Sequence, residues 1–447
     1  MGNSQSFAGD PLNSCIRCHH GVTQVCGYGI NCSVALTLFA GCRYTIISAK
    51  KVSLFEEKSV WGKIMQLSKV VLSMREECTQ VRRDLHRIPE TAFEEYQTQA
   101  YVLAYLEALQ PDVLKKLAGT GVKAVFYAKN ATETIAFRAD MDGLPIEEWT
   151  NLPYASGTPG KMHACGHDGH VTVALLLAKL VKEHRDRLHV NVVLLFQPGE
   201  EGGGGARKMI EDGALHEPRV DRIYALHVFP ELRTGQLGVR RGTFMAQSCG
   251  FDLTVHGKSA HGASPDKGID AVVAAAELIT MLQTVVSRST SPDEPIVLTI
   301  GKIHGGEARN IICDKVVMSG TLRTFSNEMR EQVMERIGKI LAGFEVATGI
   351  TTEFKEVQLY YSVENPVDMT EEFQLLMKSD VQPMQHLMIG EDFSFYQQEI
   401  PGLFFFLGIA EYSGFPPLHS PHFNFNEEAL LYGLEAYCRM LGISKER

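Results

Sequence analysis

The alternation of strand-length apolar runs with helix-length amphipathic runs constrains the fold more than any other feature of the sequence. It occupies Val171–Lys182 (helical spacing), His189–Phe196 (apolar run), Ala206–Asp212 (helical spacing) and Arg222–His227 (apolar run). Strands that alternate with helices form mostly parallel sheets covered by helices on both faces. We therefore expect an α/β domain, whose ligands bind beyond the carboxyl ends of its strands.

The segments before this alternation fit the same domain. Apolar residues recur at helical spacing from Val60 to His86, and Pro89 ends that predicted helix. A second predicted helix covers Thr91–Leu109. Two short β-rich runs follow, Gly121–Ala128 and Thr134–Arg138.

A different pattern, β-α-β-β-α-β, lies between about Gly250 and Glu356, and the α/β pattern resumes near Met369. This order is that of a ferredoxin-like α+β unit, so we expect it as a lid or dimerisation domain inserted into the first domain. Its edge strands permit pairing across a homodimer. The predicted boundaries are 1–58 (N-terminal extension), 59–249 and 358–447 (catalytic, metal-binding domain) and 250–357 (inserted domain).

Charge and cysteine content exclude some classes of partner. The chain has 447 residues, a net charge of −10 and no run of Lys and Arg, which argues against nucleic acid. Five of the ten cysteines fall within the first 42 residues, and the rest are scattered. Because this is not the pattern of a disulfide framework, we expect a reducing, cytoplasmic location.

The first 58 residues carry weak signals only. Gly2 and Ser6 stand where an N-myristoylation signal has them, and a single myristoyl chain gives only a weak membrane tether. Cys15-Ile-Arg-Cys18-His19 matches a haem-attachment pattern, but without an export signal a poorly ordered extension is the better interpretation. The apolar stretch Ile30–Ala40 is short for a membrane span.

The densest chemical cluster is MHACGHDGH, residues 162–170. Thiolate and imidazole together suit borderline metals such as zinc, and Gly166 lets the backbone bend so that both side chains point the same way. We predict Cys165 and His167 as metal ligands. Asp168 has an alternative role as a helix cap.

The segment QPGEEGGGG directly follows the apolar strand NVVLLF and carries two adjacent acids, Glu200 and Glu201. Two carboxylates at a buried strand end are costly unless a cation or another partner is present. On a tight turn neighbouring side chains point in different directions, so one can bind metal while the other faces a bound water. The alternative is a solvated acidic loop.

Two further histidine sites are weak alone. His227 closes an apolar strand, where a satisfied core histidine is the commoner case, and a Pro-bounded loop carries His419 and His422. Together with the clusters above, they supply the thiolate, imidazole and carboxylate mixture that a two-metal hydrolytic site uses.

The chain resembles the amidohydrolase branch of the aminoacylase/carboxypeptidase metallopeptidase family, which includes hippurate hydrolases, N-acyl-amino acid amidohydrolases and plant hydrolases of auxin–amino acid conjugates. The resemblance covers about residues 62–440. It is carried by RRDLHRIPE (82–90), RADMDGLPIEE (138–148), MHACGHDGH, QPGEEGGGGA, LHVFP, VHGKSAHGASPDKGID (255–270), ARNIICDKVVMSGTLRTF (308–325), GEDFSFY (390–396) and LHSPHF.

The resemblance implies hydrolysis of N-acyl amino acids at two divalent metal ions, zinc or manganese, with cobalt acceptable. Cys165 would bridge the ions, and His167, Glu201, His227 and His419 would complete their ligands. His419 is preferred to His422 because the string LHSP carries the match. Glu200 would be the general base.

Further roles follow from the same resemblance. His261 and Asn310 would bind the developing oxyanion and the substrate carboxylate, with help from Arg323. Asp140 or Asp142, and alternatively Asp168, would orient a ligand imidazole.

Three departures from the family pattern stand out. Asp266 and Cys249 stand where relatives commonly carry histidine and aspartate, and 369–390 is about one helix short before GEDFSFY.

Two rival functions remain open from sequence. A thiol hydrolase would use Cys165 as nucleophile, but it leaves Glu200 and Glu201 without a role. An inactive binding protein on the same fold predicts damaged catalytic positions, whereas every position carries a competent residue.

Overall fold

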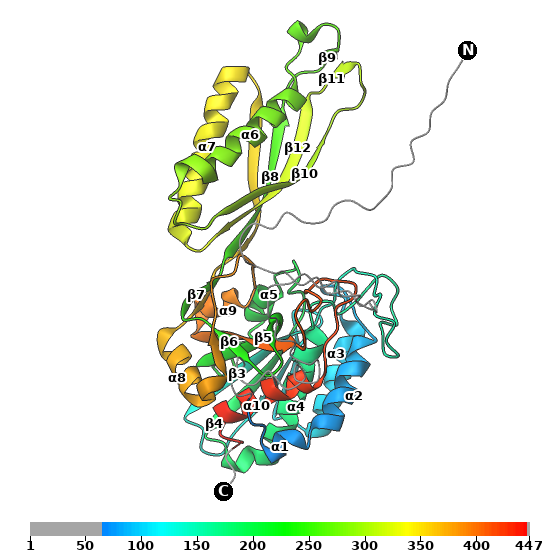
Figure 1. The fold of residues 1–447 in the computed structure, drawn as a ribbon, viewed down its shortest axis with the longest axis vertical. Coiled ribbons are helices and arrows are strands. Elements are labelled where there is room, and N and C mark those ends of the chain that lie inside the picture. Colours follow the sequence, from blue (N-terminus) through cyan, green and yellow to red (C-terminus); the bar gives the residue numbers. More distant parts are fainter. Residues whose placement is uncertain (1–64, 445–447) are drawn as a thin grey trace, which may run out of the picture. The chain divides into compact units, whose positions relative to one another are not determined.

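The computed structural model describes residues 65–444 (Figure 1). The predictions for residues 1–58, including the tether at Gly2 and the haem-attachment pattern, lie outside the described residues. So does the start of the helix expected from Val60.

An eight-stranded sheet has the order β1-β2-β4-β3-β5-β16-β6-β15. Neighbours from β4 to β16 run parallel, and β1, β2 and β4 pair antiparallel. The mostly parallel sheet predicted from the alternation is therefore confirmed. Its strands are β1 (Val113–Leu117), β2 (Gly121–Phe126), β3 (Glu133–Asp140), β4 (Val190–Gln197), β5 (Arg222–Arg233), β6 (Leu237–Val239), β15 (Val381–Pro383) and β16 (Gly402–Ala410).

Helices cover both faces because successive strand residues point to opposite sides. On β4, for example, Leu194 belongs to one buried cluster and Leu195 to another. The first face carries α2 (Arg75–His86), α3 (Tyr96–Leu109), α4 (His167–His184), α8 (Val367–Met377) and α10 (Glu428–Met440). The second face carries α5 (Gly205–Glu211) and α9 (Ser394–Glu399).

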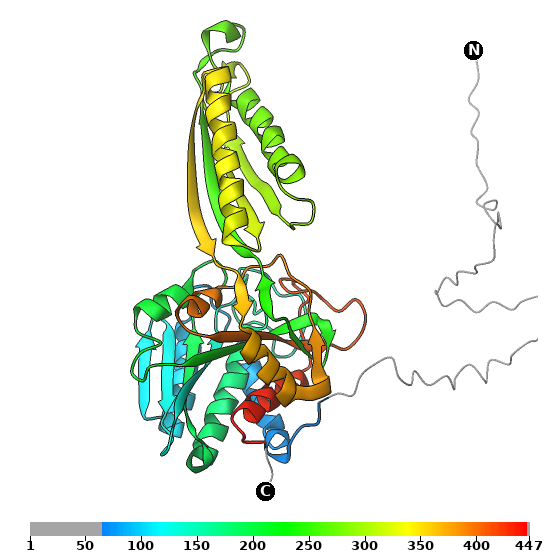
Figure 2. The same ribbon diagram turned by 90° about the vertical axis from the view of Figure 1, so that its left-hand side faces the viewer.

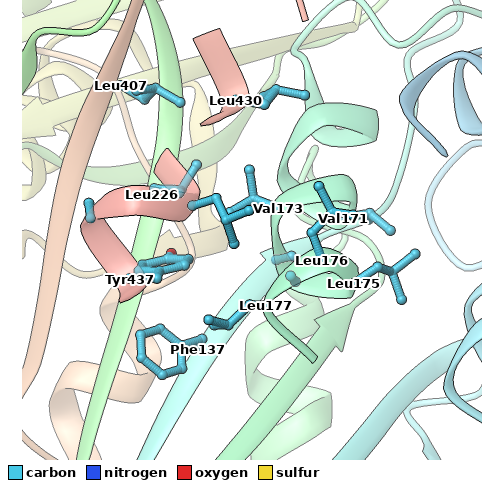
Figure 3. Packing of buried hydrophobic residues seen from close by; sticks show 14 of the residues in the cluster. Phe137, Val171, Val173, Leu175, Leu176, Leu177, Leu226, Leu407, Leu430 and Tyr437 are labelled. Carbon is cyan, nitrogen blue, oxygen red and sulfur yellow. The ribbon is translucent and has the colours of Figure 1, made fainter. Parts of the chain in front are cut away.

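The core of the first face lies between α4, α10 and the sheet (Figure 3). Phe137 of β3 and Tyr437 of α10 have ring centroids 4.5 Å apart. Helix α4 is buried along most of its length. Its first turn, which carries His167, is therefore anchored by the packing of the whole helix.

A second sheet of four antiparallel strands, in the order β10-β12-β8-β13, uses residues 247–360. Helices α6 and α7 lie on the same face of it (Figure 2). This confirms the predicted ferredoxin-like order; the boundaries at 250 and 357 stay a prediction. The elements are β8 (Gln247–His256), β9 (Ala260–His261), α6 (Ala271–Ser289), β10 (Val297–Gly305), β11 (Ile311–Ile312), β12 (Lys315–Thr324), α7 (Asn327–Thr348) and β13 (Thr351–Tyr360).

Two paired strands join the sheets. β7 (Gly242–Met245) leads into β8, and β14 (Val363–Asn365) follows β13 and pairs antiparallel with β7.

Some element limits differ from the sequence-based expectation. The first helix is broken into α1 (Lys69–Leu72) and α2, and at the break the Ser73 hydroxyl bonds the Val70 carbonyl oxygen in competition with the helix. Helix α3 begins at Tyr96 rather than Thr91, because the carboxylate of Glu90 accepts hydrogen bonds from the free amides of Gln97 and Thr98. Strand β1 was not predicted.

The short segment before GEDFSFY contains α8, a single turn at Lys378–Asp380 and β15. Residues 384–393 then run without a helix, and Leu387 forms a bridge with Met245 of β7.

Candidate functional site

The predicted chemical residues converge at the carboxyl ends of β3 and β4 and beside the middle of β5. The β3–β4 pairing ends at Asp140 and Gln197, and Glu200 and Glu201 lie in the turn that follows β4. The β3–β5 pairing ends at Arg138 and Ala225, so His227 lies two residues beyond it.

Cys165 is placed by a tight turn before α4. Gly166 has φ +85°, and a Cβ there would come within 2.4 Å of Val228 on β5. Only glycine allows this close approach. The turn therefore brings the Cys165 thiol against β5, beside His227.

The Cys165 sulfur lies between two histidines, 3.4 Å from Nε2 of His227 and 3.4 Å from Nε2 of His419. Nε2 of His419 is 3.0 Å from Oε1 of Glu201. Ligand atoms of Cys165, His167 and Glu201 all lie within 4.8 Å of one another. All five residues predicted as metal ligands are thus brought together.

Backbone carbonyls set the tautomers of two of these histidines. Nδ1 of His167 lies 2.9 Å from the Asp142 carbonyl oxygen, and Nδ1 of His227 lies 2.7 Å from that of Val228. Because Nδ1–H donates in each case, Nε2 is the nitrogen left for a metal. Nε2 of His167 is buried and has no hydrogen-bond partner among the described residues, as expected of a ligand atom.

Electrostatics of the metal-free chain also favour cations. Burial, followed by the charges of Glu201 and Glu200, raises the pKa of the Cys165 thiol well above its usual value. Burial, followed by Glu391 and Glu201, does the same to the pKa of Glu200. Burial opposes protonation of His167, but Asp140 and Asp142 outweigh it and raise its pKa to about 10. Surplus negative charge therefore surrounds the cluster, and the raised thiol pKa counts against Cys165 as a free nucleophile.

The supporting residues differ in part from those predicted. Asp140 accepts from Nδ1 of His170 at 2.5 Å, and Nε2 of His170 accepts from the Val228 amide at 2.9 Å. His170 is therefore fully hydrogen-bonded, and it links Asp140 to the backbone beside His227. The carboxylate of Asp142 accepts from the amides of Glu200 (3.1 Å) and Glu201 (2.9 Å).

Asp168 does not contact a ligand histidine among the described residues. Its carboxylate pairs with Nε of Arg82 (3.0 Å) and Nδ1 of His86 (2.6 Å) on α2. The reason is helical geometry, since Asp168 follows His167 directly and so points toward α2 rather than toward the cluster. The prediction that Asp168 orients a ligand imidazole is corrected; Asp142 contacts His167 through its carbonyl oxygen.

A cavity of about 530 Å³ opens beside the cluster. Arg323, Ser248 and Tyr360 line it from the base of the second sheet. Apolar side chains complete its wall: Met245, Met388, Ile389, Phe404, Phe406 and Leu418. His261 and Asn310 are exposed near the β9–β11 pair and do not line this cavity. His422 is also exposed, with Nδ1 3.2 Å from the Trp149 carbonyl oxygen.

Sequence reasoning missed the buried residue Arg138. Its guanidinium donates to Asp140 (2.5 Å), Glu391 (2.9 Å) and Asp392 (2.8 Å). The available signal was an arginine inside the apolar strand TIAFRAD, where a charge requires partners.

Comparison with known proteins agrees with this geometry. Residues 136–442 match the model of peptidase family M20/M25/M40. The N-acetyldiaminopimelate deacetylase of Listeria monocytogenes is 39% identical over 376 residues, covering 82% of this chain and 99% of that protein. A deacetylase of the same name from Bacillus cytotoxicus is 40% identical over 361 residues, covering 80% and 95%.

A solved structure is similar across the fold. The YXEP protein of Bacillus subtilis, described as a dinuclear metal-binding peptidase from the M20 family, gives a TM-score of 0.72 at 33% identity and covers 83% of this chain and 99% of its own. The chain therefore belongs to peptidase family M20/M25/M40, as a metal-dependent amidohydrolase of that family.

Proposed function

We propose that the chain hydrolyses the amide bond of N-acyl amino acids to a carboxylic acid and an amino acid. The observation that carries the proposal is the convergence of Cys165, His167, Glu201, His227 and His419 beside a cavity that also holds Glu200 and Arg323. The named deacetylase relatives support an N-acyl amino acid as the substrate class.

The donor set fits divalent cations: Cys165, His167, Glu201, His227 and His419 would hold two of them. Zinc is favoured by the thiolate, and manganese or cobalt is compatible with the carboxylate and imidazole donors. When bound, the cations lower the pKa of water at the site toward neutrality.

Glu200 is the general base in this proposal. Its carboxylate removes a proton from the attacking water as the new C–O bond forms, then passes that proton to the amine nitrogen as the C–N bond breaks. Asp142 holds the Glu200 amide, and Glu200 lines the cavity.

Arg323 is the proposed site for the substrate carboxylate. It makes no ion pair among the described residues, and burial lowers the pKa of its guanidinium. A half-buried cation on a cavity wall, without a carboxylate partner among the described residues, favours an anionic group of the ligand. The apolar side chains that line the same cavity would take the acyl group.

His261 and Asn310 do not line the cavity of their own chain. We propose that they reach the substrate from a second copy, in a homodimer formed through the inserted domain. A cytoplasmic location, with a weak tether through Gly2, also stays a prediction.

Glu200→Gln should retain both metals and lower kcat by about a hundredfold or more, because it removes the base but no ligand. Elemental analysis of protein purified without added metal, together with turnover on N-acetyl, N-benzoyl and longer N-acyl amino acids, checks this. Full turnover in the variant would remove Glu200 as the base.

Cys165→Ser should lose bound metal and activity, whereas Cys249→Ser, at a buried cysteine on β8, should keep both. Chelation should abolish wild-type activity, and zinc or manganese should restore it. A thiol hydrolase would behave differently, since its activity would survive complete removal of metal.

Arg323→Gln should raise KM for an N-acyl amino acid by about 10- to 100-fold, because a charge-assisted contact is lost. KM for the corresponding uncharged N-acyl amino acid amide should hardly change. Arg330→Gln is the matched control, because Arg330 is paired with Glu356 and does not line the cavity. An equal rise in KM for acid and amide would contradict carboxylate binding by Arg323.

Co-expression of His261→Ala with Glu200→Gln chains should restore activity well above that of either variant alone, because mixed dimers contain one intact composite site. If the mixture stays as inactive as the separate variants, His261 does not act from a second copy.

A further inference from the structure

The turn that carries both Glu200 and Glu201 is rich in glycine, and its backbone lies close to the Phe93 ring at Gly199 and Gly203. It continues into Gly202, Gly203 and Gly204, and Gly202 and Gly204 have φ values of +91° and +65°. A Cβ at either of these two glycines would meet nothing within 4 Å. Two hydrogen bonds of its own hold the backbone of the turn: the Gly202 amide donates to the Glu200 carbonyl oxygen at 2.7 Å, and the Gly205 amide donates to the Gly199 carbonyl oxygen at 3.1 Å. Contacts from outside the turn add to these two bonds.

One such contact comes from Tyr360. Its hydroxyl accepts a hydrogen bond from the Gly204 amide at 3.1 Å and donates to the Glu200 carbonyl oxygen at 3.4 Å. A tyrosine hydroxyl has one proton to donate and lone pairs to accept, and here both functions are used. The contact thus joins the two ends of the turn, whereas Asp142 holds only its first two amides.

Tyr360 reaches the turn from a distant part of the chain. It is the last residue of β13 and pairs with Ser248 on β8, at the point where the second sheet joins the strands β7 and β14. Its ring packs edge-on against Phe395 of α9, with centroids 5.7 Å apart, and lines the cavity. Only 8% of the residue is exposed, so its hydroxyl is held in place.

We infer that Tyr360 is a positioning residue of the hydrolytic reaction. Its hydroxyl fixes the position of the Glu200–Gly204 turn relative to the strands that leave the second sheet. It thereby fixes where the Glu200 carboxylate meets the substrate. The inference rests on the proposed role of Glu200 as base. Because proton transfer requires hydrogen-bond distance, a turn free to shift would lower kcat more than it changes substrate binding.

Tyr360→Phe removes the hydroxyl and keeps the ring. Tyr361→Phe is a matched control, since Tyr361 is the next residue and its ring also packs edge-on against Phe395, at 5.5 Å. In the metal-loaded full chain, residue-resolved hydrogen exchange should accelerate at the Gly204 amide in Tyr360→Phe. It should stay unchanged at the Ala206 amide, which bonds Asp392.

The same variant should lower kcat by about 3- to 10-fold, the loss expected for one or two neutral hydrogen bonds. KM, metal content and Tm should match those of wild type, and Tyr361→Phe should match wild type throughout.

Unchanged exchange at Gly204 in Tyr360→Phe would overturn the inference. Faster exchange at Gly204 with an unchanged kcat would also overturn it, because the Tyr360 contact would then hold the turn without affecting catalysis. A parallel fall in Tm and kcat would assign Tyr360 a merely structural role. Failure of the proposed function would give a different result, because the wild-type chain would then turn over no N-acyl amino acid. Hydrogen exchange at the Gly204 amide would still report on the Tyr360 contact in that case.

Discussion

A single buried guanidinium, that of Arg138, connects the parts of the chain that form the site. Its nitrogens reach Asp140 at the end of β3, Gln197 at the end of β4, and Glu391 and Asp392 some 250 residues later. Burying a charge is costly unless it is paired, and breaking such a pair typically costs about 3–5 kcal/mol. The side chains around the proposed base are therefore held together by an interaction that tolerates little change.

Much of the architecture was predictable because periodicity and spacing are local properties. The alternation from Val171 to His227 reports burial of strands and helices, so the mostly parallel sheet and the succession of strands and helices along this stretch could be inferred. The ferredoxin-like order was readable for the same reason. Three of the proposed ligands, Cys165, His167 and Glu201, could be proposed because MHACGHDGH and QPGEEGGGG place unusual donors beside predicted strands, whereas His227 and His419 followed from the family resemblance.

The parts that were not predicted depend on contacts between distant residues. Nothing near Tyr360 in the sequence indicates that its hydroxyl meets the Glu200 turn, and GEDFSFY alone does not reveal that its acids pair with Arg138. Asp168 was assigned by proximity to His167, whereas helix geometry directs it to Arg82 and His86. The break between α1 and α2 depends on a hydroxyl competing with a backbone amide, which hydrophobic spacing cannot report.

His419 differs in its setting from the other proposed ligands. Cys165, His167 and His227 are buried, whereas the His419 side chain is 50% exposed and its backbone has φ +63° in a loop bounded by Pro417 and Pro421. Positive φ is unfavourable for a residue with a Cβ, so the backbone conformation at His419 does not itself stabilise the loop. The proposed metal centre therefore takes most of its donor atoms from the packed core and one from a surface loop.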